Sequence, residues 1–184
     1  LEKKIPKNNT VYDVNQFDLK DQFLADIRND KELFREIKRE LDRLNIVDND
    51  PKRDAVYEKI SQVLQQEEPK RKIIVFSEYV DTIRHLEGYL RDRLGNRLLV
   101  CDGTVTKELS RHLNSDFDAQ YKGTQTDHFD VLITSDKLSE GFNLNRAGAI
   151  INYDIPWNPT RVIQRIGRIN RIGVKVFDEL FIFN

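Results

Sequence analysis

Hydrophobic positions divide the chain into two regions with different periodicities. From Leu19 to Leu44 the apolar residues recur every three or four positions, as on an amphipathic helix. We expect two helices there, with Asn29-Asp30 capping the second one. Residues 45–51 are a polar turn, and Pro51 sits at the first turn of a further helix. The polar faces of these expected helices are strongly charged, which favours a solvated outer layer over a dedicated partner site.

Five short apolar runs follow Pro69, and each is continuous rather than alternating. Continuous runs are typical of strands buried on both faces of a parallel sheet. The runs are 73–76, 98–101, 131–133, 149–151 and 180–183. Helical patterns separate several of them, as at 80–94 and 107–117, so the order of elements predicts an α/β fold: a parallel sheet with helices on both sides. We therefore expect a helical extension over residues 1–48 and one α/β domain over residues 49–184.

Small polar residues follow four of the predicted strands. In an open parallel sheet, ligands bind beyond the carboxyl ends of the strands, so these residues predict a functional edge. They are Ser77, the run Asp102-Gly103-Thr104, the run Thr134-Ser135-Asp136, and the pair Asn152 and Asp154.

The parts of a complete nucleotide-hydrolysing site are missing from the sequence. None of the eight glycines is followed by lysine, so no phosphate-binding loop of the form G-x-x-x-x-G-K-[ST] is present. Asp178-Glu179 precedes an apolar run, whereas a magnesium-holding pair follows one. The three histidines, His85, His112 and His128, are far apart along the chain and show no metal-ligand spacing. We therefore expect neither a phosphate cradle nor a metal site in this chain.

The composition limits the surface charge, the redox compartment and the membrane topology that we expect, but it does not indicate a function. Thirty basic residues against 31 acidic ones give a net charge of −1, so any basic surface must be local. The single cysteine, Cys101, excludes an internal disulfide and favours a reducing compartment. No apolar run approaches membrane-spanning length. The chain begins at Leu1 and contains no methionine, so we expect an excerpt from a longer protein.

The strongest signal is a basic segment between Ile155 and Phe177. It contains four arginines and one lysine but no acid: Arg161, Arg165, Arg168, Arg171 and Lys175. On a helix beginning near Pro159, the first three arginines share one face, and Val162, Ile163, Ile166 and Ile169 lie toward the other, which we expect to pack on the sheet. A guanidinium group forks onto oxyanions, so a row of arginines without nearby acids in the sequence suits phosphates. Spacing alone leaves a solvated basic face equally open.

Several motifs in this region resemble those of superfamily 2 helicases. The run from Gln164 to Arg171, QRIGRINR, resembles the last conserved helicase motif, [QH]-R-x-G-R-x-x-R. Residues 139–144, SEGFNL, resemble motif V, and residues 73–79, IIVFSEY, resemble motif IV. Residues 153–159, YDIPWNP, are similar to the signature of the Swi/Snf branch of double-stranded-DNA translocases. The resemblance extends from Pro51 to Asn184, with the motifs in family order.

The resemblance implies a RecA-like lobe that supplies half of an ATPase site. ATP and Mg²⁺ would be held mainly by an absent N-terminal RecA-like lobe, and Arg168 and Arg171 would be catalytic arginine fingers. Gln164, Gly141 and Asn143 would contact the nucleotide. Five residues are assigned to nucleic acid, for which we expect duplex DNA: Ser77, Thr104, Ser135, Trp157 and Arg161.

Two departures from the Swi/Snf pattern indicate a divergent bacterial branch. Ser139-Glu140 stands where that pattern has a glycine pair, and Gln164 stands where it often has aspartate. We expect a cytoplasmic, nucleoid-associated protein with no membrane partner. Two alternatives stay open: an RNA helicase lobe, and a non-catalytic α/β module that binds nucleic acid or a partner protein. Trp157 could equally be a packing residue or a base-stacking contact.

Overall fold

The structure, a computed structural model, describes residues 12–66, 70–103, 105–136, 141–171 and 176–184. The chain divides into two compact units, residues 1–50 and 51–184. Among the described residues, no helix combines the length and the apolar character that crossing a membrane requires.

The first unit is dominated by one long helix, α1 (Lys20–Leu44), which follows a short 3-10 turn, η1 (Val14–Gln16). The helix ends where Asn45 takes a left-handed conformation with φ 46°, and its N–H bonds the carbonyl of Asp42. No α1 residue is buried. Ion pairs three or four residues apart line its polar side, such as Lys38–Asp42 at 2.7 Å.

The prediction of two helices in this region is wrong, because α1 continues through Asn29 and Asp30 without a break. Asparagine and aspartate favour caps, but each costs a helix interior only about 0.7 kcal/mol relative to alanine. Neither glycine nor proline interrupts the segment. The local capping signal is therefore too weak to end the helix.

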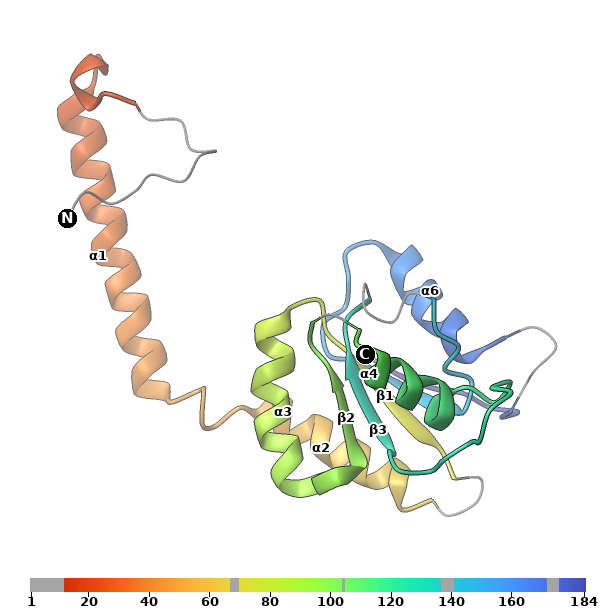
Figure 1. Ribbon diagram of the computed structural model, residues 1–184. Coiled ribbons are helices and arrows are strands. Elements are labelled where there is room, and N and C mark those ends of the chain that lie inside the picture. Colours follow the sequence, from red (N-terminus) through yellow and green to blue (C-terminus); the bar gives the residue numbers. More distant parts are fainter. Residues whose placement is uncertain (1–11, 67–69, 104, 137–140, 172–175) are drawn as a thin grey trace. The chain divides into compact units, whose positions relative to one another are not determined.

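The second unit is built from five strands and the helices between them (Figure 1). The strands are β1 (Lys72–Phe76), β2 (Leu98–Cys101), β3 (Val131–Thr134), β4 (Ala147–Asn152) and β5 (Phe181–Phe183). The helices are α2 (Pro51–Leu64), α3 (Val80–Leu94), η2 (Gly95–Arg97), α4 (Lys107–His112), the π-helical turn η3 (Leu113–Phe117) and α6 (Pro159–Ile169).

All strand pairs in the sheet are parallel, and the strand order is β2-β3-β1-β4-β5. The predicted α/β fold with a parallel sheet is confirmed, and the five predicted strands agree with the observed ones to within two residues. From the central strand β1 the chain crosses to the edge strand β2, returns to β3 beside β1, and then passes to β4 and β5 on the other side of β1. All five β1 residues are buried, as the continuous apolar run predicts.

Alternate residues of the sheet face two separate hydrophobic cores. On one face, Ile73 and Val75 pack with side chains of α2 and α3, including Ile60 and Leu86. On the other face, Ile74 and Phe76 belong to a second core. That second core includes Leu113 and Phe117 of η3 and Ile169 of α6. In Figure 1, α2 and α3 lie on one side of the sheet and α4 on the other.

A network of ion pairs lies at the amino ends of β1 and β3. Lys70 and Lys72 donate to the Asp127 carboxylate at 2.8 and 2.6 Å, and Arg97 donates to Asp130 at 2.6 Å. Burial acts to raise the pKa of Asp127, but the hydrogen bonds and charges of the two lysines outweigh it and hold the pKa far below its usual range. The network ties the segment before β3 to the start of β1.

Candidate nucleotide and nucleic-acid site

The carboxyl ends of four strands meet at one edge of the sheet, as predicted. Phe76, the last residue of β1, pairs with Thr134 of β3 and Asn152 of β4, and Cys101 of β2 also pairs with Thr134. The polar residues that follow these strands therefore lie along a common edge. Thr104, one of the predicted nucleic-acid residues, lies outside the described residues.

Ser77 links two of these strand ends. Its hydroxyl donates to Asp154 Oδ2 at 2.5 Å, and Asp154 Oδ1 lies 3.7 Å from Lys52 Nζ. Ser77 has no exposed surface, and Ser135 is 8% exposed. In this arrangement Ser77 positions the loop after β4 and offers no surface to a phosphate, so we leave it out of the proposed interface.

Arg165 is buried and points into the domain, which corrects the expectation of an arginine row facing phosphates. Its guanidinium forms a two-pronged ion pair with Asp136, at 2.6 Å from Nε and 2.8 Å from Nη2. It also donates to Asn152 Oδ1 at 2.8 Å and lies over the Phe76 ring at 5.0 Å. Only 1% of the residue is exposed. Arg165 therefore binds the ends of β3 and β4 to α6.

The rest of α6 also departs from the predicted division of its faces. Ile163, expected on the sheet, is 68% exposed, whereas Ile169 is buried in the second core. Arg161 pairs with Glu78, which follows β1, at 2.8 Å. The segment contains no acid of its own, but strand ends far away in sequence supply acids to its first two arginines. A helix-spacing argument cannot register such partners.

The last turn of α6 and the residues just after it are different. Among the residues that the structure describes, no carboxylate pairs with Arg168 or Arg171. Arg168 is half-buried, while Arg171 and Gln164 are exposed. The carbonyl of Arg168 accepts a hydrogen bond from Leu144 N at 3.0 Å. This bond holds the end of α6 against the segment that leads into β4, away from the carboxyl edge.

That segment contains the other predicted nucleotide residues. Gly141 has φ 91°, a conformation that side chains other than glycine rarely adopt. Asn143 Nδ2 donates to Asp118 at 3.4 Å. The fold thus brings Gly141, Asn143 and Arg168 into one neighbourhood. Ser139 and Glu140, the first two residues of the segment that resembles motif V, lie outside the described residues.

Trp157 lies in the loop between β4 and α6, and its relative exposure is 102%. A packing role within this chain's own core is therefore excluded. The loop reaches α6 through Asn158, whose side chain accepts from Thr160 N and caps the helix ahead of Pro159. Trp157 and Arg161 thus lie at the start of α6, apart from Arg168 and Arg171 at its end.

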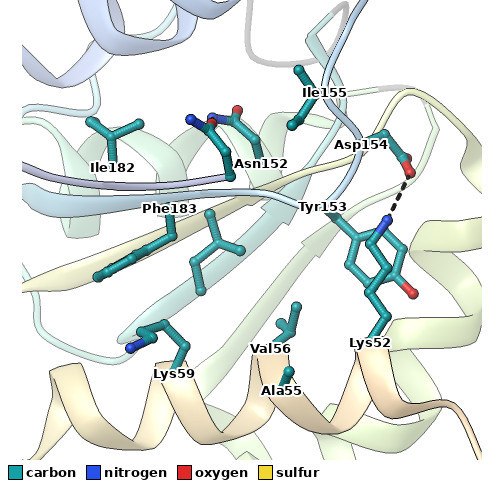
Figure 2. A pocket seen from close by; sticks show the side chains of 12 residues that line it. Lys52, Ala55, Val56, Lys59, Asn152, Tyr153, Asp154, Ile155, Ile182 and Phe183 are labelled. Atoms are coloured by element: carbon teal, nitrogen blue, oxygen red, sulfur yellow. Dashed lines mark hydrogen bonds and ion pairs between the residues drawn. The ribbon is translucent and has the colours of Figure 1, made fainter.

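Sequence reasoning missed a cavity of about 710 Å³ between α2 and the β4–β5 side of the sheet. Figure 2 shows Val56 and Phe183 among its apolar walls, with Lys52 reaching toward Asp154 at its mouth. Its size falls within the range of small-molecule sites. No periodic or motif signal could have indicated it, because its walls come from residues about a hundred positions apart.

Comparison with known proteins defines the class of molecule. The structure resembles the C-terminal part of the Fun30 ATPase domain with a TM-score of 0.56, at 23% identity over 71% of this chain and 38% of that one. It also resembles domain 2 of the DEAD-box helicase Mss116p bound to an RNA duplex, with a TM-score of 0.55 at 19% identity over 72% of this chain and 49% of that one. The fold is therefore that of a RecA-like helicase C-terminal lobe.

Sequence similarity identifies the family. Residues 55–173 match the helicase conserved C-terminal domain, so the chain belongs to that family. It is 35% identical over 119 residues to the RNA polymerase-associated protein RapA of Vibrio campbellii, covering 64% of this chain and 12% of RapA. It is 32% identical over 133 residues to YqhH of Bacillus subtilis, named an uncharacterized ATP-dependent helicase, covering 72% of this chain and 21% of YqhH. The chain thus spans a small part of the length of either relative.

Proposed function

We propose that this chain is the C-terminal motor lobe of an ATP-dependent translocase that acts on duplex DNA. The observation that carries the proposal is the division among the arginines of the basic segment. Arg161 and Arg165 are paired with acids, whereas Arg168 and Arg171 have no acidic partner among the described residues. Two guanidinium groups with no acidic partner in the described part of the chain, one in the last turn of α6 and one just beyond its end, are suited to bind phosphate oxygens.

In this proposal an N-terminal RecA-like lobe of the same protein holds most of the ATP and Mg²⁺. Bound ATP supplies the phosphoryl group that is transferred to water. Arg168 and Arg171 bind its oxygens and stabilise the negative charge that grows on them. Gln164, exposed one turn earlier, contacts the nucleotide or its water. The main chain around Gly141 and the Asn143 side chain complete this lobe's contribution.

Duplex DNA would contact a different part of the lobe. Trp157 and Arg161 lie at the start of α6, next to the carboxyl edge with Ser135, and we assign the DNA contact to this region together with Thr104. The assigned contacts are hydroxyls, one arginine and one aromatic ring, which suit binding of the DNA backbone and stacking but not base reading. Since both named relatives are bacterial, we place the protein in the bacterial cytoplasm, associated with the nucleoid.

The proposal is tested by measuring ATP hydrolysis with the full-length protein and with the 184-residue chain. We expect the full-length protein to be stimulated by duplex DNA and the chain alone to be inactive, because it lacks a phosphate-binding loop. Stimulation by RNA duplexes and not by DNA would favour an RNA helicase lobe. Hydrolysis by the chain alone would refute the half-site proposal, and an inactive full-length protein would favour a non-catalytic module.

A binding titration adds an independent check. The chain carries a net charge of −1, so its affinity for duplex DNA must come from the local surface at the start of α6. We expect weak binding that falls steeply as salt rises, because phosphate contacts release counterions. Tight binding that depends on base sequence and hardly on salt would contradict the proposal.

A further inference from the structure

Two histidines that are distant in sequence meet on the second core's side of the sheet. His112 ends α4, and His128 lies in the segment between η3 and β3, yet their ring centroids are 6.5 Å apart. This corrects the expectation that the histidines are scattered. Asp116 of η3 joins them, and one ligand atom from each of the three residues lies within 4.8 Å of the other two.

The Asp116 carboxylate is fully buried and held in place by its neighbours. Oδ1 accepts hydrogen bonds from the N–H groups of His128 and Phe129 at 2.6 and 3.1 Å, and Oδ2 accepts one from the Thr126 hydroxyl at 2.7 Å. Burial acts to raise the pKa of Asp116, but these hydrogen bonds outweigh it and hold the pKa below its usual value. The carboxylate is therefore ionised at neutral pH.

The imidazole nitrogens lie close to carboxylate oxygens. His128 Nδ1 is 3.9 Å from Asp116 Oδ2, and His112 Nε2 is 3.9 Å from Oε1 of Glu108, one turn earlier on α4. The side chain of Glu108 is 78% exposed and that of His128 is 65% exposed, so both can rotate. The four residues together offer two nitrogen and two oxygen ligands.

Two neighbouring cations, Arg146 and Lys72, are directed at other acceptors. Arg146 Nη1 donates to the carbonyls of Ser115 and Thr126, and Lys72 donates to Asp127 and to the carbonyl of Phe129. A cavity of about 350 Å³ opens beside the histidines and gives an approach from solvent. It is lined by Arg111, His112, Ser115, Tyr121, Thr124, Thr126 and His128.

We propose that His112, Asp116 and His128 bind a divalent zinc-class metal ion, with Glu108 or water as the fourth ligand. Imidazole with carboxylate favours Zn²⁺ over Mg²⁺ and Ca²⁺, which prefer oxygen ligands alone. Two ligands on one tetrahedral zinc lie about 3.3 Å apart, since each bond is about 2.0–2.1 Å long. The exposed His128 ring therefore turns toward Asp116 on binding. The hydrogen bonds to Asp116 provide the outer shell that orients a ligating carboxylate.

The site would be structural rather than catalytic. It joins α4 and η3 to the segment that leads into β3, whose first residue is Val131. That end of β3 is opposite the carboxyl edge assigned to DNA. Metal binding would therefore fasten the connection between η3 and β3, and it is independent of the proposed motor function.

The test uses the 184-residue chain, stripped with a chelator and titrated with ZnCl₂ by calorimetry, and with CoCl₂ by visible absorbance. We expect one saturable site, a higher melting temperature with zinc, and cobalt absorbance typical of four- or five-fold coordination. His112→Gln and His128→Gln should each weaken zinc binding by at least about tenfold, since even an outer-shell partner is worth that much. His85→Gln on α3 is the matched control and should bind zinc as the wild type does.

Asp116 is left unchanged in this test, because removing a buried carboxylate with several donors would disrupt the segment itself. A melt without metal checks that each histidine variant is folded. The proposal is overturned if zinc does not bind at micromolar concentration, or if the two variants bind it as tightly as the His85 control. The two histidines would then serve only to pack on the Phe129 ring, with centroid distances of 5.1 Å for His112 and 6.4 Å for His128.

Discussion

The first and second halves of the basic segment differ in what their arginines contact. Arg161 and Arg165 find carboxylates that follow β1 and β3, while Arg168 and Arg171 find none among the described residues. The four residues are the same amino acid at similar spacing on one stretch of chain. The comparison teaches that an arginine's role depends on which strand ends the sheet brings to it.

The arginines of this segment therefore fall into two groups, one that stabilises the domain and one that is available to bind a ligand. The buried Arg165 guanidinium stabilises the domain: it uses four of its five N–H donors within the chain, and only 1% of the residue is exposed to a ligand. An unpaired guanidinium retains its full capacity for oxyanions. Substituting the two kinds of arginine should therefore damage different properties, and the following variants test that separation.

The largest effect is expected from Arg168→Lys in the full-length protein. Lysine keeps the charge but loses the fork that grips two oxygens, so we expect turnover to fall by about 10³-fold, the lower end of what an arginine finger contributes. ATP and DNA affinities should change far less. The measurement is the steady-state ATPase rate at saturating duplex DNA.

Arg91→Lys is the matched control for that variant. Arg91 pairs with Glu87 at 2.7 Å on the surface of α3 and should tolerate lysine with normal turnover. Near-normal turnover in Arg168→Lys would show that Arg168 braces the lobe or holds DNA, and the proposed catalytic role would be lost.

The next largest effect is expected from Arg165→Gln, and it concerns stability. The variant leaves Asp136 without its buried partner, which typically costs about 3–5 kcal/mol of unfolding free energy. Urea denaturation of the 184-residue chain measures it. Arg161→Gln is the control within the same helix: its ion pair is solvent-exposed, so the loss should stay below about 1 kcal/mol. Equal losses would mean that burial does not separate the two arginines.

A smaller, functional effect is expected from Trp157→Ala. The side chain is fully exposed, so the melting temperature should not change. Stacking of a base on an aromatic ring is worth about 1–3 kcal/mol, so the DNA concentration for half-maximal ATPase stimulation should rise about 5- to 150-fold. Tyr12→Ala removes another exposed aromatic ring and should leave stimulation intact. An unchanged half-maximal DNA concentration in the Trp157 variant would show that the ring does not contact DNA.

The smallest effect is expected from acid at the amino ends of the strands. The folded-state pKa of Asp127 lies below its unfolded value of about 4, so its contribution to stability is present above that pH and is lost as the pH falls. Urea unfolding between pH 7 and pH 3 should show this loss. Because the Asp127 side chain is 49% exposed, we expect less than about 1 kcal/mol.

Asp127→Asn should remove the part of that pH dependence that belongs to Asp127, and Asp81→Asn should leave the pH dependence unchanged. The Asp81 side chain is 99% exposed and serves as the matched carboxylate. If the pH dependence is as large in Asp127→Asn as in the wild type, the responsible group lies elsewhere, with the buried Asp116 as the next residue to examine.

Much of the fold could be predicted because its signals are local. The continuous apolar runs identified every strand of the sheet, and Pro51 marked the start of α2 to the residue. Four polar strand endings predicted a shared edge, and the registers around Phe76 confirm it. The error in α1 arose from a local signal too, since capping preference is weak against the continuity of a long helix.

The site could be predicted only in part. Motif spacing singled out Arg168, Arg171 and Trp157, and the roles proposed for them await the experiments above. Spacing also placed Arg165 beside them, but the structure buries it against Asp136, 29 residues earlier in the chain. The meeting of His112 with His128 and the cavity beside α2 escaped sequence reasoning for the same reason.

Periodicity and composition reflect interactions over a few residues, and they were sufficient for the strands and the parallel sheet. Strand order, the pairing of each charge and the burial of each arginine depend on segments that meet only when the chain has folded. Electrostatic and packing energies are set by distances in space, which spacing along the chain does not encode. Hence Arg165 is buried in the domain, whereas Arg168, three residues later, is half-buried at the end of α6. Of the two, only Arg168 has surface through which it could bind a ligand.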